Sequence, residues 1–199
     1  NNSLNTILNE IRAQQVSTES VQLLRQTRQQ KLEADITRLF THNVDVEQIN
    51  QRYMNGINQK SYVFNAEVKG NEKLVQTLIS NVRAPQQLVL KLGAKVMFVK
   101  NNMESGYING TLGEVVDFIE EDGQTLPKVK LRDGTHLYVT PETWSIDNDS
   151  AKPLASYSQI PLCLAWAITV HKSQGMTLEA AEIDLSQTFE QGQGYVALS

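Results

Sequence analysis

The first part of the chain alternates between two patterns of apolar and polar positions, one typical of helices and one of strands. Apolar residues near the start recur at the i, i+3, i+4, i+7 spacing of an amphipathic helix, namely Leu4, Ile7, Leu8 and Ile11. From Tyr62 to Val68 the apolar residues instead alternate with polar ones, as in a half-buried strand. In chain order the pattern predicts helices at 4–11, 17–33, 45–57 and 72–79, and strands at 36–41 and 62–68. Asp45 is the expected N-cap of the third helix. This part of the chain is predicted to be α/β.

The pattern changes near residue 88, where short strand-like runs follow one another. They lie at 88–92, 94–100, 111–119, 127–131 and 136–140, and the turn signals between them are Gly93, Asn109-Gly110, Asp122-Gly123 and Asp133-Gly134. This spacing, with its Asn-Gly and Asp-Gly turns, is typical of a small β-barrel over about residues 93–146. A long apolar run follows at 160–170, and a strand is predicted at 181–185. The sequence therefore predicts an α/β domain that is interrupted by a barrel and then resumes.

Composition excludes few partner classes. The 199 residues include 18 Lys+Arg and 22 Asp+Glu, and 40% are hydrophobic, which suffices for a real core. One cysteine, Cys163, excludes an intrachain disulfide framework, and the longest apolar run is too short to span a bilayer. The net charge of −4 is uneven, since residues 1–90 carry 10 basic and 8 acidic side chains and residues 91–150 carry 6 and 10. Because phosphate binding depends on local potential, the net charge does not decide against nucleic acid.

No complete active site is visible in the sequence. It contains no G-x-x-x-x-G-K-[ST] phosphate loop, no G-x-G-x-x-G turn and no H-E-x-x-H. The three histidines, His42, His136 and His171, lie in separate segments without metal-ligand spacing, so no metal site is expected.

Two polar clusters follow apolar segments and could contact phosphate. The richer one, at 169–177, offers hydroxyl, imidazole, ammonium and amide groups after the apolar run. The other, at 41–43, follows the strand predicted at 36–41, and the carboxyl ends of strands are where open α/β sheets bind ligands. Each has a simpler interpretation that the pattern leaves open: a glycine-capped helix end for the first, and ordinary helix capping for the second.

Four stretches resemble motifs of superfamily I DNA helicases of the PIF and RecD types, which include the exonuclease V alpha subunit. Residues 159–178 closely resemble motif V, and residues 192–199 look like the start of motif VI. Residues 37–43, with Asp45 and Asn50 behind them, look like motif IV. Residues 106–113 resemble the glycine-bearing turn of the SH3-like barrel inserted in these helicases.

The resemblance implies a C-terminal fragment of a helicase. Residues 1–35 would be a helical segment from the end of the first RecA-like domain, residues 36–92 and 147–199 the second RecA-like (P-loop-NTPase-type) domain, and residues 93–146 the inserted SH3-like β-barrel. ATP and Mg²⁺ would bind in the full-length protein, whose Walker motifs would precede this chain and whose motif VI arginine would follow Ser199. We therefore expect no catalytic residue, no bound cofactor and no activity in the fragment alone.

Site residues follow from the same resemblance. Those expected on the DNA are Thr41, His42, Asn43, Thr169, His171, Lys172 and Ser173. Those expected to face the nucleotide, or to couple it to the DNA, are Gln174, Gly175, Gln193, Gly194 and Tyr195. Outside these sets, Trp166 is expected in the core rather than under a base, and Cys163 as a buried thiol. Tyr107 and Asn109 could either touch DNA or form an ordinary hairpin tip.

The expected function is ATP-dependent 5′→3′ translocation on single-stranded DNA and unwinding at junctions with duplex, in DNA repair or recombination. Expected partners are single-stranded DNA, such junctions and subunits of a repair complex, with no membrane. The expected compartment is the bacterial cytoplasm, or the nucleus or mitochondrion in a eukaryote. The alternative is a non-catalytic nucleic-acid or protein interaction module with a degenerate helicase fold.

Overall fold

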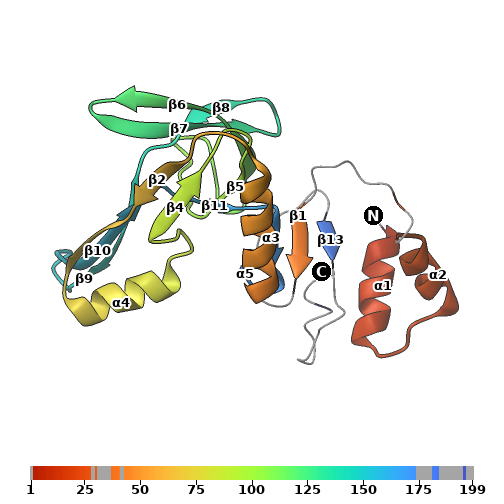
Figure 1. The fold of residues 1–199 in the computed structure, drawn as a ribbon. Helices are drawn as coiled ribbons and strands as arrows, with labels where there is room; N and C mark the ends of the chain where they lie inside the picture. The colour runs from red at the N-terminus through yellow and green to blue at the C-terminus, as the bar shows by residue number, and fades with distance from the viewer. Residues whose placement is uncertain are drawn as a thin grey trace. The chain divides into compact units, whose positions relative to one another are not determined.

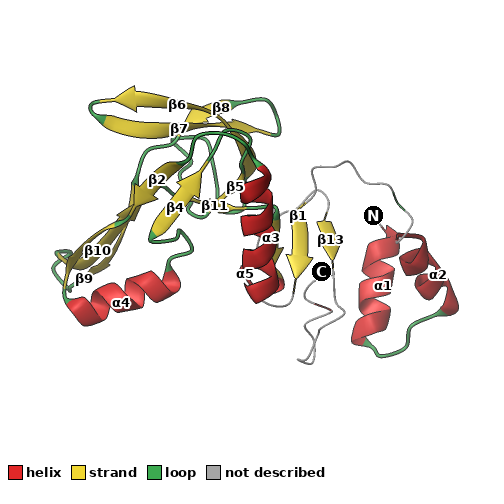
Figure 2. Cartoon of the chain, viewed as in Figure 1, coloured by secondary structure: helices red, strands yellow, loops and turns green. Residues whose placement is uncertain are grey.

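The computed structural model describes residues 2–27, 30, 37–40, 43–173, 181–183 and 195, and divides into two compact units (Figures 1 and 2). One unit comprises residues 1–47 and 167–199, and the other comprises residues 48–166. The elements are α1 (Asn2–Arg12), α2 (Thr18–Thr27), β1 (Thr37–Phe40), α3 (Asn43–Gly56), β2 (Tyr62–Asn65), β3 (Glu67–Gly70), α4 (Glu72–Asn81), β4 (Gln87–Leu90), β5 (Lys95–Phe98), β6 (Leu112–Glu121), β7 (Gln124–Leu131), β8 (His136–Tyr138), β9 (Glu142–Asp147), β10 (Pro153–Gln159), β11 (Leu162–Leu164), β12 (Ala167–Thr169), α5 (Val170–Ser173) and β13 (Ala181–Ile183).

The first unit contains a parallel sheet of order β12-β1-β13. Leu39 of β1 and Ile168 of β12 are buried, as expected for parallel strands that carry apolar residues on their faces. The α/β character predicted from the sequence is confirmed. The strands predicted at 36–41 and 181–185 are found at 37–40 and 181–183.

Two helices open the same unit, and a carboxylate joins them. Glu10, near the end of α1, accepts hydrogen bonds from the backbone N–H and the hydroxyl of Ser17, both at 2.9 Å. Hydrogen bonds from the side chain of Ser20 and from Ser17 lower the pKa of Glu10. Because Ser17 directly precedes α2, these bonds fix the start of that helix against the end of α1.

The second unit is built on a five-stranded antiparallel sheet of order β11-β5-β6-β7-β8. One face of this sheet buries the main core cluster, which includes Val96, Phe98, Val115, Val129 and Leu162. Four of the five strands predicted between residues 88 and 140 belong to it, whereas the first, 88–92, becomes β4 and pairs with β2.

The SH3-like barrel expected over residues 93–146 is not confirmed, because the described strands form no closed barrel. Strands β11 and β8 lie at the two edges of the sheet. Strand β8 has three residues and pairs with β7, while β11 occupies the edge of β5. The turn glycines behave as predicted, since Gly110, Gly123 and Gly134 all have positive φ.

The strand predicted at 62–68 divides into two strands that join different sheets. Strand β2 pairs with β4, whereas β3 pairs with β10. Ala66 lies between them, and its N–H donates to the carbonyl of Gln86 at 2.8 Å. The period-two pattern runs through both strands without a break, so no local signal marks the change of partner.

A third sheet, of order β3-β10-β9, packs against α4. Val75 and Leu78 of α4 are buried against Ala155 and Tyr157 of β10. Helix α4 begins after Asn71, whose side chain accepts hydrogen bonds from the N–H groups of the first turn. Strands β9 and β10 were not predicted, although in each of them apolar residues alternate with serine or threonine as in a half-buried strand.

A buried glutamine at the end of β10 joins three segments of the second unit. The Nε2 group of Gln159 donates to the carbonyls of Phe64, Pro85 and Gln86 at 3.1, 2.9 and 3.2 Å. Its Oε1 accepts from the N–H of Ile160 at 2.8 Å. One side chain therefore contacts four backbone groups near the ends of β2, β4 and β10, with the two hydrogens of Nε2 shared among three carbonyls.

Candidate nucleic-acid interface

The two polar clusters predicted to contact phosphate follow neighbouring parallel strands. Strand β1 pairs with β12 so that Phe40 lies opposite Thr169, which places the carboxyl ends of both strands at the same edge of the sheet. The chain leaves β1 after Phe40 and β12 after Thr169, both at this edge. Such an edge is where open parallel sheets bind ligands.

The end of β12 is buried, and the turn after it is held by its own hydroxyl. The side chain of Thr169 is 3% exposed, and Val170 is buried as well. Helix α5 is a single turn in which Ser173 Oγ donates to the carbonyl of Val170 at 2.7 Å. The Ser173 hydroxyl therefore donates its hydrogen within the chain, and toward a ligand it could only accept a hydrogen bond.

The structure describes part of each predicted set of site residues. Asn43 is the first residue of α3, so Asp45 lies in the first turn and not at the N-cap, contrary to the prediction. His171 and Lys172 lie in α5, the turn that follows β12. Outside the described residues lie Thr41, His42, Gln174, Gly175, Gln193 and Gly194.

Tyr195, from the expected nucleotide-facing set, contacts α1. Arg12 donates from Nη2 to the Tyr195 hydroxyl, and its guanidinium carbon lies 5.1 Å from the centre of the ring. An arginine at the end of α1 thus meets a tyrosine 183 positions later in the chain. No local pattern in the sequence predicts this pair.

The central strand of the sheet carries an ion pair that sequence reasoning missed. Arg38 of β1 donates from Nε to Oε2 of Glu182 in β13 at 2.9 Å, and the two residues are direct neighbours in the parallel register. Both side chains are more than a third exposed, at 37% and 64%, so the pair contributes little to stability. Glu182 thus places a negative charge beside the positive charge of Arg38 on this side of the sheet.

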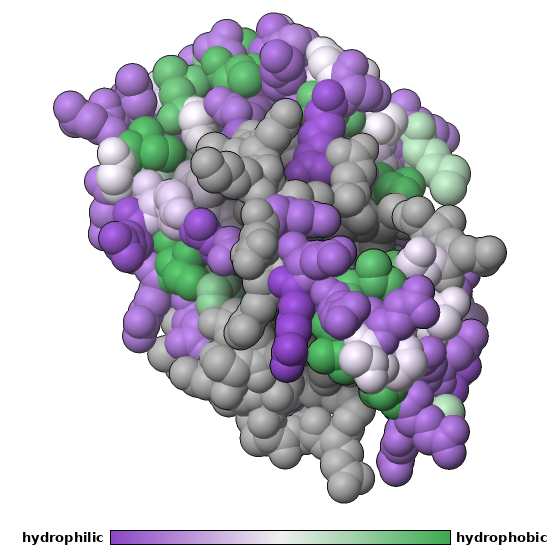
Figure 3. Space-filling view, turned by 90° about the vertical axis from the view of Figure 1, so that its right-hand side faces the viewer, coloured by the Kyte–Doolittle hydropathy of each residue, from purple (hydrophilic) through white to green (hydrophobic). Residues whose placement is uncertain are grey.

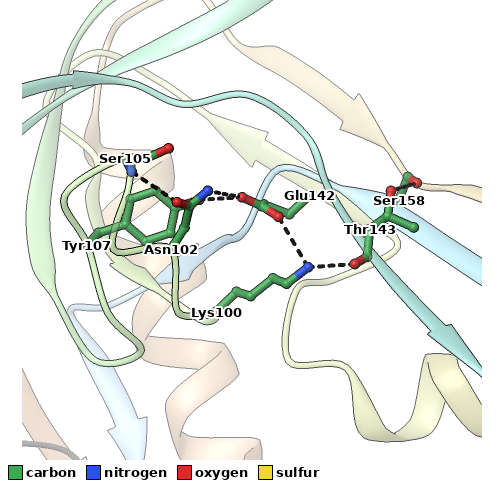
Figure 4. A network of polar contacts seen from close by, with 7 residues as sticks. All are labelled: Lys100, Asn102, Ser105, Tyr107, Glu142, Thr143 and Ser158. Atoms are coloured by element: carbon green, nitrogen blue, oxygen red, sulfur yellow. Dashed lines mark hydrogen bonds and ion pairs between the residues drawn. The ribbon is translucent and has the colours of Figure 1, made fainter.

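In the second unit, the loop between β5 and β6 is held by a polar network (Figure 4). Glu142 is its centre: Oε1 accepts from Asn102 Nδ2 at 2.6 Å and from the Tyr107 hydroxyl at 3.0 Å. Lys100 Nζ lies 3.1 Å from Glu142 Oε2 and also donates to the carbonyl of Thr143. Asn102 and Tyr107 also exchange backbone hydrogen bonds at 2.9 and 3.1 Å, so both side-chain and backbone hydrogen bonds fix the loop.

Tyr107 is a structural residue in this loop. Its ring is 5% exposed and stacks on Phe98 with centroids 4.1 Å apart. Burial, followed by the hydrogen bond to Glu142, raises the pKa of Tyr107. A DNA contact through this ring, one of the two alternatives open from the sequence, does not fit its burial. Asn109, beside it, is half-buried and its Oδ1 has no hydrogen-bond partner within the described part of the chain.

The network predicts how stability depends on pH. Burial alone would raise the pKa of Glu142, but hydrogen bonds from Asn102, Lys100 and Tyr107 outweigh it and lower that pKa. A carboxyl whose folded pKa is lowered stabilises the fold at pH above its ordinary value of 4.5, and this contribution is lost as the pH falls through the folded pKa.

We therefore expect Glu142→Gln to lower the stability of this loop at pH 7 by about 1–3 kcal/mol, because the amide cannot accept from all three donors. At pH 3 the loss should be much smaller. Hydrogen exchange of residues 100–110 in the whole protein measures both values, with Glu121→Gln, at an exposed position, as the control. An equal loss at both pH values would contradict the assigned role of the carboxylate.

The remaining candidates from the sequence are in structural positions. Trp166 is half-buried against the core cluster and stacks on Tyr53 at 5.7 Å, in agreement with the expected core role. Cys163 is half-buried rather than fully buried.

Within the described residues, no group of three His, Cys, Asp or Glu side chains could hold a metal ion, and no helix is long and apolar enough to cross a membrane. Hydrophobic and hydrophilic residues are intermixed on the coloured part of the face in Figure 3.

Comparison with known proteins gives consistent matches. A family model for the 2B domain of the DNA helicase Pif1 matches residues 73–118. The ATP-dependent DNA helicase Pif1 of Psychrobacter is 42% identical over 99% of this chain, which spans 37% of that protein. The unliganded structure of Pif1 from Bacteroides superposes with a TM-score of 0.81 and 31% identity, covering 100% of this chain and 46% of that one.

A second solved structure carries ligands. It is the Pif1 helicase from Bacteroides in complex with ADP-AlF3 and single-stranded DNA, and it matches with a TM-score of 0.69 and 32% identity over 98% of this chain and 46% of that one. The chain spans less than half the length of each of these relatives.

Proposed function

Over the part of those helicases that it spans, this chain belongs to the Pif1 family, and from this premise we propose that it is part of an ATP-dependent DNA helicase that binds single-stranded DNA. The observation that carries the proposal is the shared edge of β1 and β12, where the segments resembling motifs IV and V leave neighbouring strands. The DNA-bound Bacteroides structure, with a TM-score of 0.69, supports the assignment of a nucleic-acid ligand.

The residues proposed for the DNA interface fall into two groups: those that would donate to phosphates and those that would hold the edge of the sheet. Thr41, His42, Asn43, His171 and Lys172 would supply amide, imidazole, hydroxyl and ammonium donors to phosphates at the strand edge. Thr169 and Ser173 would act differently from the donors expected of them. Because Thr169 is buried and the Ser173 hydroxyl donates to Val170, these two would hold the edge in shape.

Nucleotide use is proposed for the whole protein. Gln174, Gly175, Gln193, Gly194 and Tyr195 would face the nucleotide or couple it to the DNA. The one described member of this set, Tyr195, contacts Arg12 of α1 through its hydroxyl and ring. The sequence has no phosphate loop and the described residues offer no cluster of Mg²⁺ ligands, so we derive no catalytic step within this chain.

Further aspects of the proposal come from the family resemblance. The chain would form the second RecA-like domain, at residues 36–92 and 147–199, with an insertion at 93–146 that would be SH3-like and a segment 1–35 from the preceding domain. Translocation would run 5′→3′, unwinding would begin at junctions of single and double strands, and the pathway would be repair or recombination with subunits of a repair complex. The compartment would be one that holds DNA: bacterial cytoplasm, nucleus or mitochondrion.

The test uses the whole protein and the lysine of α5. Lys172→Ala should weaken binding to single-stranded DNA and reduce the slope of log affinity against log salt by about 0.7, the value for one phosphate contact on a single strand. DNA-stimulated ATPase and unwinding should fall with it. Gln174→Ala should keep DNA affinity but lose stimulation of the ATPase, since its proposed role is coupling.

Lys152→Ala is the matched control, because Lys152 is exposed in the turn before β10. It should leave affinity, salt slope and ATPase unchanged. Undiminished DNA-stimulated ATPase in both Lys172→Ala and Gln174→Ala would contradict the proposed function.

A further inference from the structure

The face of the five-stranded sheet opposite the main core cluster, its outer face, carries a group of charged side chains around β7. Along β7, Val129 and Leu131 are buried in the core cluster, so the alternate residues Lys128 and Lys130 lie on the opposite face. Lys130 is exposed and Lys128 is half-buried. The strand register determines which residues join them on that face.

Two rows of side chains cross this outer face. In the first, Lys95, Glu114, Lys130 and His136 are successive cross-strand neighbours on β5, β6, β7 and β8. In the second, Asp117, Lys128 and Tyr138 are neighbours on β6, β7 and β8. We call these seven residues the outer-face cluster.

Ion pairing removes only part of the positive charge of the outer-face cluster. Lys95 Nζ lies 2.6 Å from Glu114 Oε2, so these two charges neutralise each other. Lys128 remains beside Asp117 in the register, and Lys130 has no ion-pair partner in the part of the chain that the structure describes. Three lysines against two carboxylates leave the cluster net positive, although residues 91–150 as a whole are acidic.

The acidic side chains of the segment lie mainly at turns and strand ends. Glu120, Glu121 and Asp122 lie at the hairpin between β6 and β7, and Asp133 lies in the turn before β8. Local potential over the outer-face cluster is therefore set by its own lysines more than by the net charge of the segment.

Tyr138 gives the outer-face cluster an exposed aromatic surface. It is 51% exposed, and Lys128 Nζ lies 5.1 Å from the centre of its ring. An exposed aromatic ring next to lysines on a sheet face is the arrangement on which unpaired bases stack while cations meet the phosphates. Duplex is a poor fit, because its bases are already stacked.

We propose that the outer-face cluster binds single-stranded nucleic acid, with a base stacked on Tyr138 and phosphates contacting Lys128 and Lys130. This site goes beyond the proposed function, which places DNA at the edge of β1 and β12. It does not depend on that edge, because every residue in it belongs to the second unit.

The test measures binding of the whole protein to a fluorescein-labelled oligothymidine by anisotropy at several salt concentrations. Tyr138→Ala should weaken binding about tenfold, and Tyr138→Phe should restore most of the affinity because it keeps the ring. The double variant Lys128→Ala/Lys130→Ala should reduce the salt slope by about 1.4, the value for two phosphate contacts. Lys152→Ala is the control for lost charge elsewhere on the same unit.

Hydrogen exchange of β6, β7 and β8 verifies that each variant keeps the sheet. Unchanged affinity in Tyr138→Ala together with an unchanged slope in the double variant would overturn the inference. Failure here is distinguishable from failure of the proposed function: Lys172→Ala would still weaken DNA binding if only the outer-face site is wrong. If Lys172→Ala has no effect while the outer-face variants do, the proposed strand edge is wrong instead.

Discussion

Replacing Gly70 with alanine is expected to destabilise the sheet of β3, β10 and β9 by about 3–5 kcal/mol, a loss large enough to open it. Gly70 has φ +105°, which alanine rarely adopts. A Cβ atom there would also lie 2.2 Å from the carbonyl oxygen of Leu154 and 2.6 Å from Cα of Ala155. Both atoms are backbone of the neighbouring strand, so the clash cannot be relieved by a rotamer change.

The matched control is Gly123→Ala, in the hairpin between β6 and β7. Gly123 also has positive φ, at +76°, but a Cβ there would meet nothing within 4 Å. This variant should cost only about 1–2 kcal/mol, from backbone strain alone. Hydrogen exchange of β3 and β10 in the whole protein measures the first variant, and exchange of β6 and β7 measures the second. Equal losses in the two variants would contradict the close approach of β3 to β10.

Gln159→Leu is expected to cost about 3–5 kcal/mol, because it removes four hydrogen bonds at once and leaves the buried N–H of Ile160 without its acceptor. Leucine is similar in size to glutamine but offers no donor to the carbonyls of Phe64, Pro85 and Gln86. It also removes the acceptor of the Ile160 N–H. The loss should appear as faster exchange near the ends of β2, β4 and β10.

Gln87→Leu serves as the control for the same chemical change at an exposed position. The side chain of Gln87 donates one hydrogen bond, from Nε2 to Asn65 Oδ1 at 3.2 Å, between β4 and β2. Its replacement should change stability by about 0.5 kcal/mol or less. If Gln159→Leu is as mild as this control, the four bonds of Gln159 do not hold these segments together.

Local signals sufficed to predict most individual elements of the fold. The Asn-Gly and Asp-Gly turns at Gly110, Gly123 and Gly134 marked the strand ends, and these glycines have the positive φ that such turns require. Helix α4 and the strands β1 and β13 were found by periodicity and begin or end within two residues of the predicted positions.

Pairings between distant segments could not be predicted in the same way. Nothing in residues 62–68 shows that β2 pairs with β4 while β3 pairs with β10. The apolar run at 160–170 contributes β11 to the five-stranded sheet and β12 to the parallel sheet, and nothing in the run marks where one sheet ends and the other begins. Closure of the predicted barrel depends on such pairings and is not confirmed.

The candidate site shows the same division. The polar clusters at 41–43 and 169–177 stand out locally, and the parallel register of β1 and β12 brings the starts of both to one edge. Tyr107 looked like an exposed turn residue, because its burial depends on Phe98 and on Glu142, 35 positions later. The outer-face cluster was invisible for a similar reason, since its residues come together only through the register of four strands.

If the edge at the ends of β1 and β12 binds DNA, the residues that follow these strands should lie against the bound strand. Photo-crosslinking of the whole protein to single-stranded DNA containing bromodeoxyuridine, followed by mass spectrometry of the labelled peptides, measures this contact. We expect crosslinks in the peptides that contain residues 41–43 and 170–173. Crosslinks confined to other peptides, in a protein that binds the DNA, would contradict DNA binding at this edge.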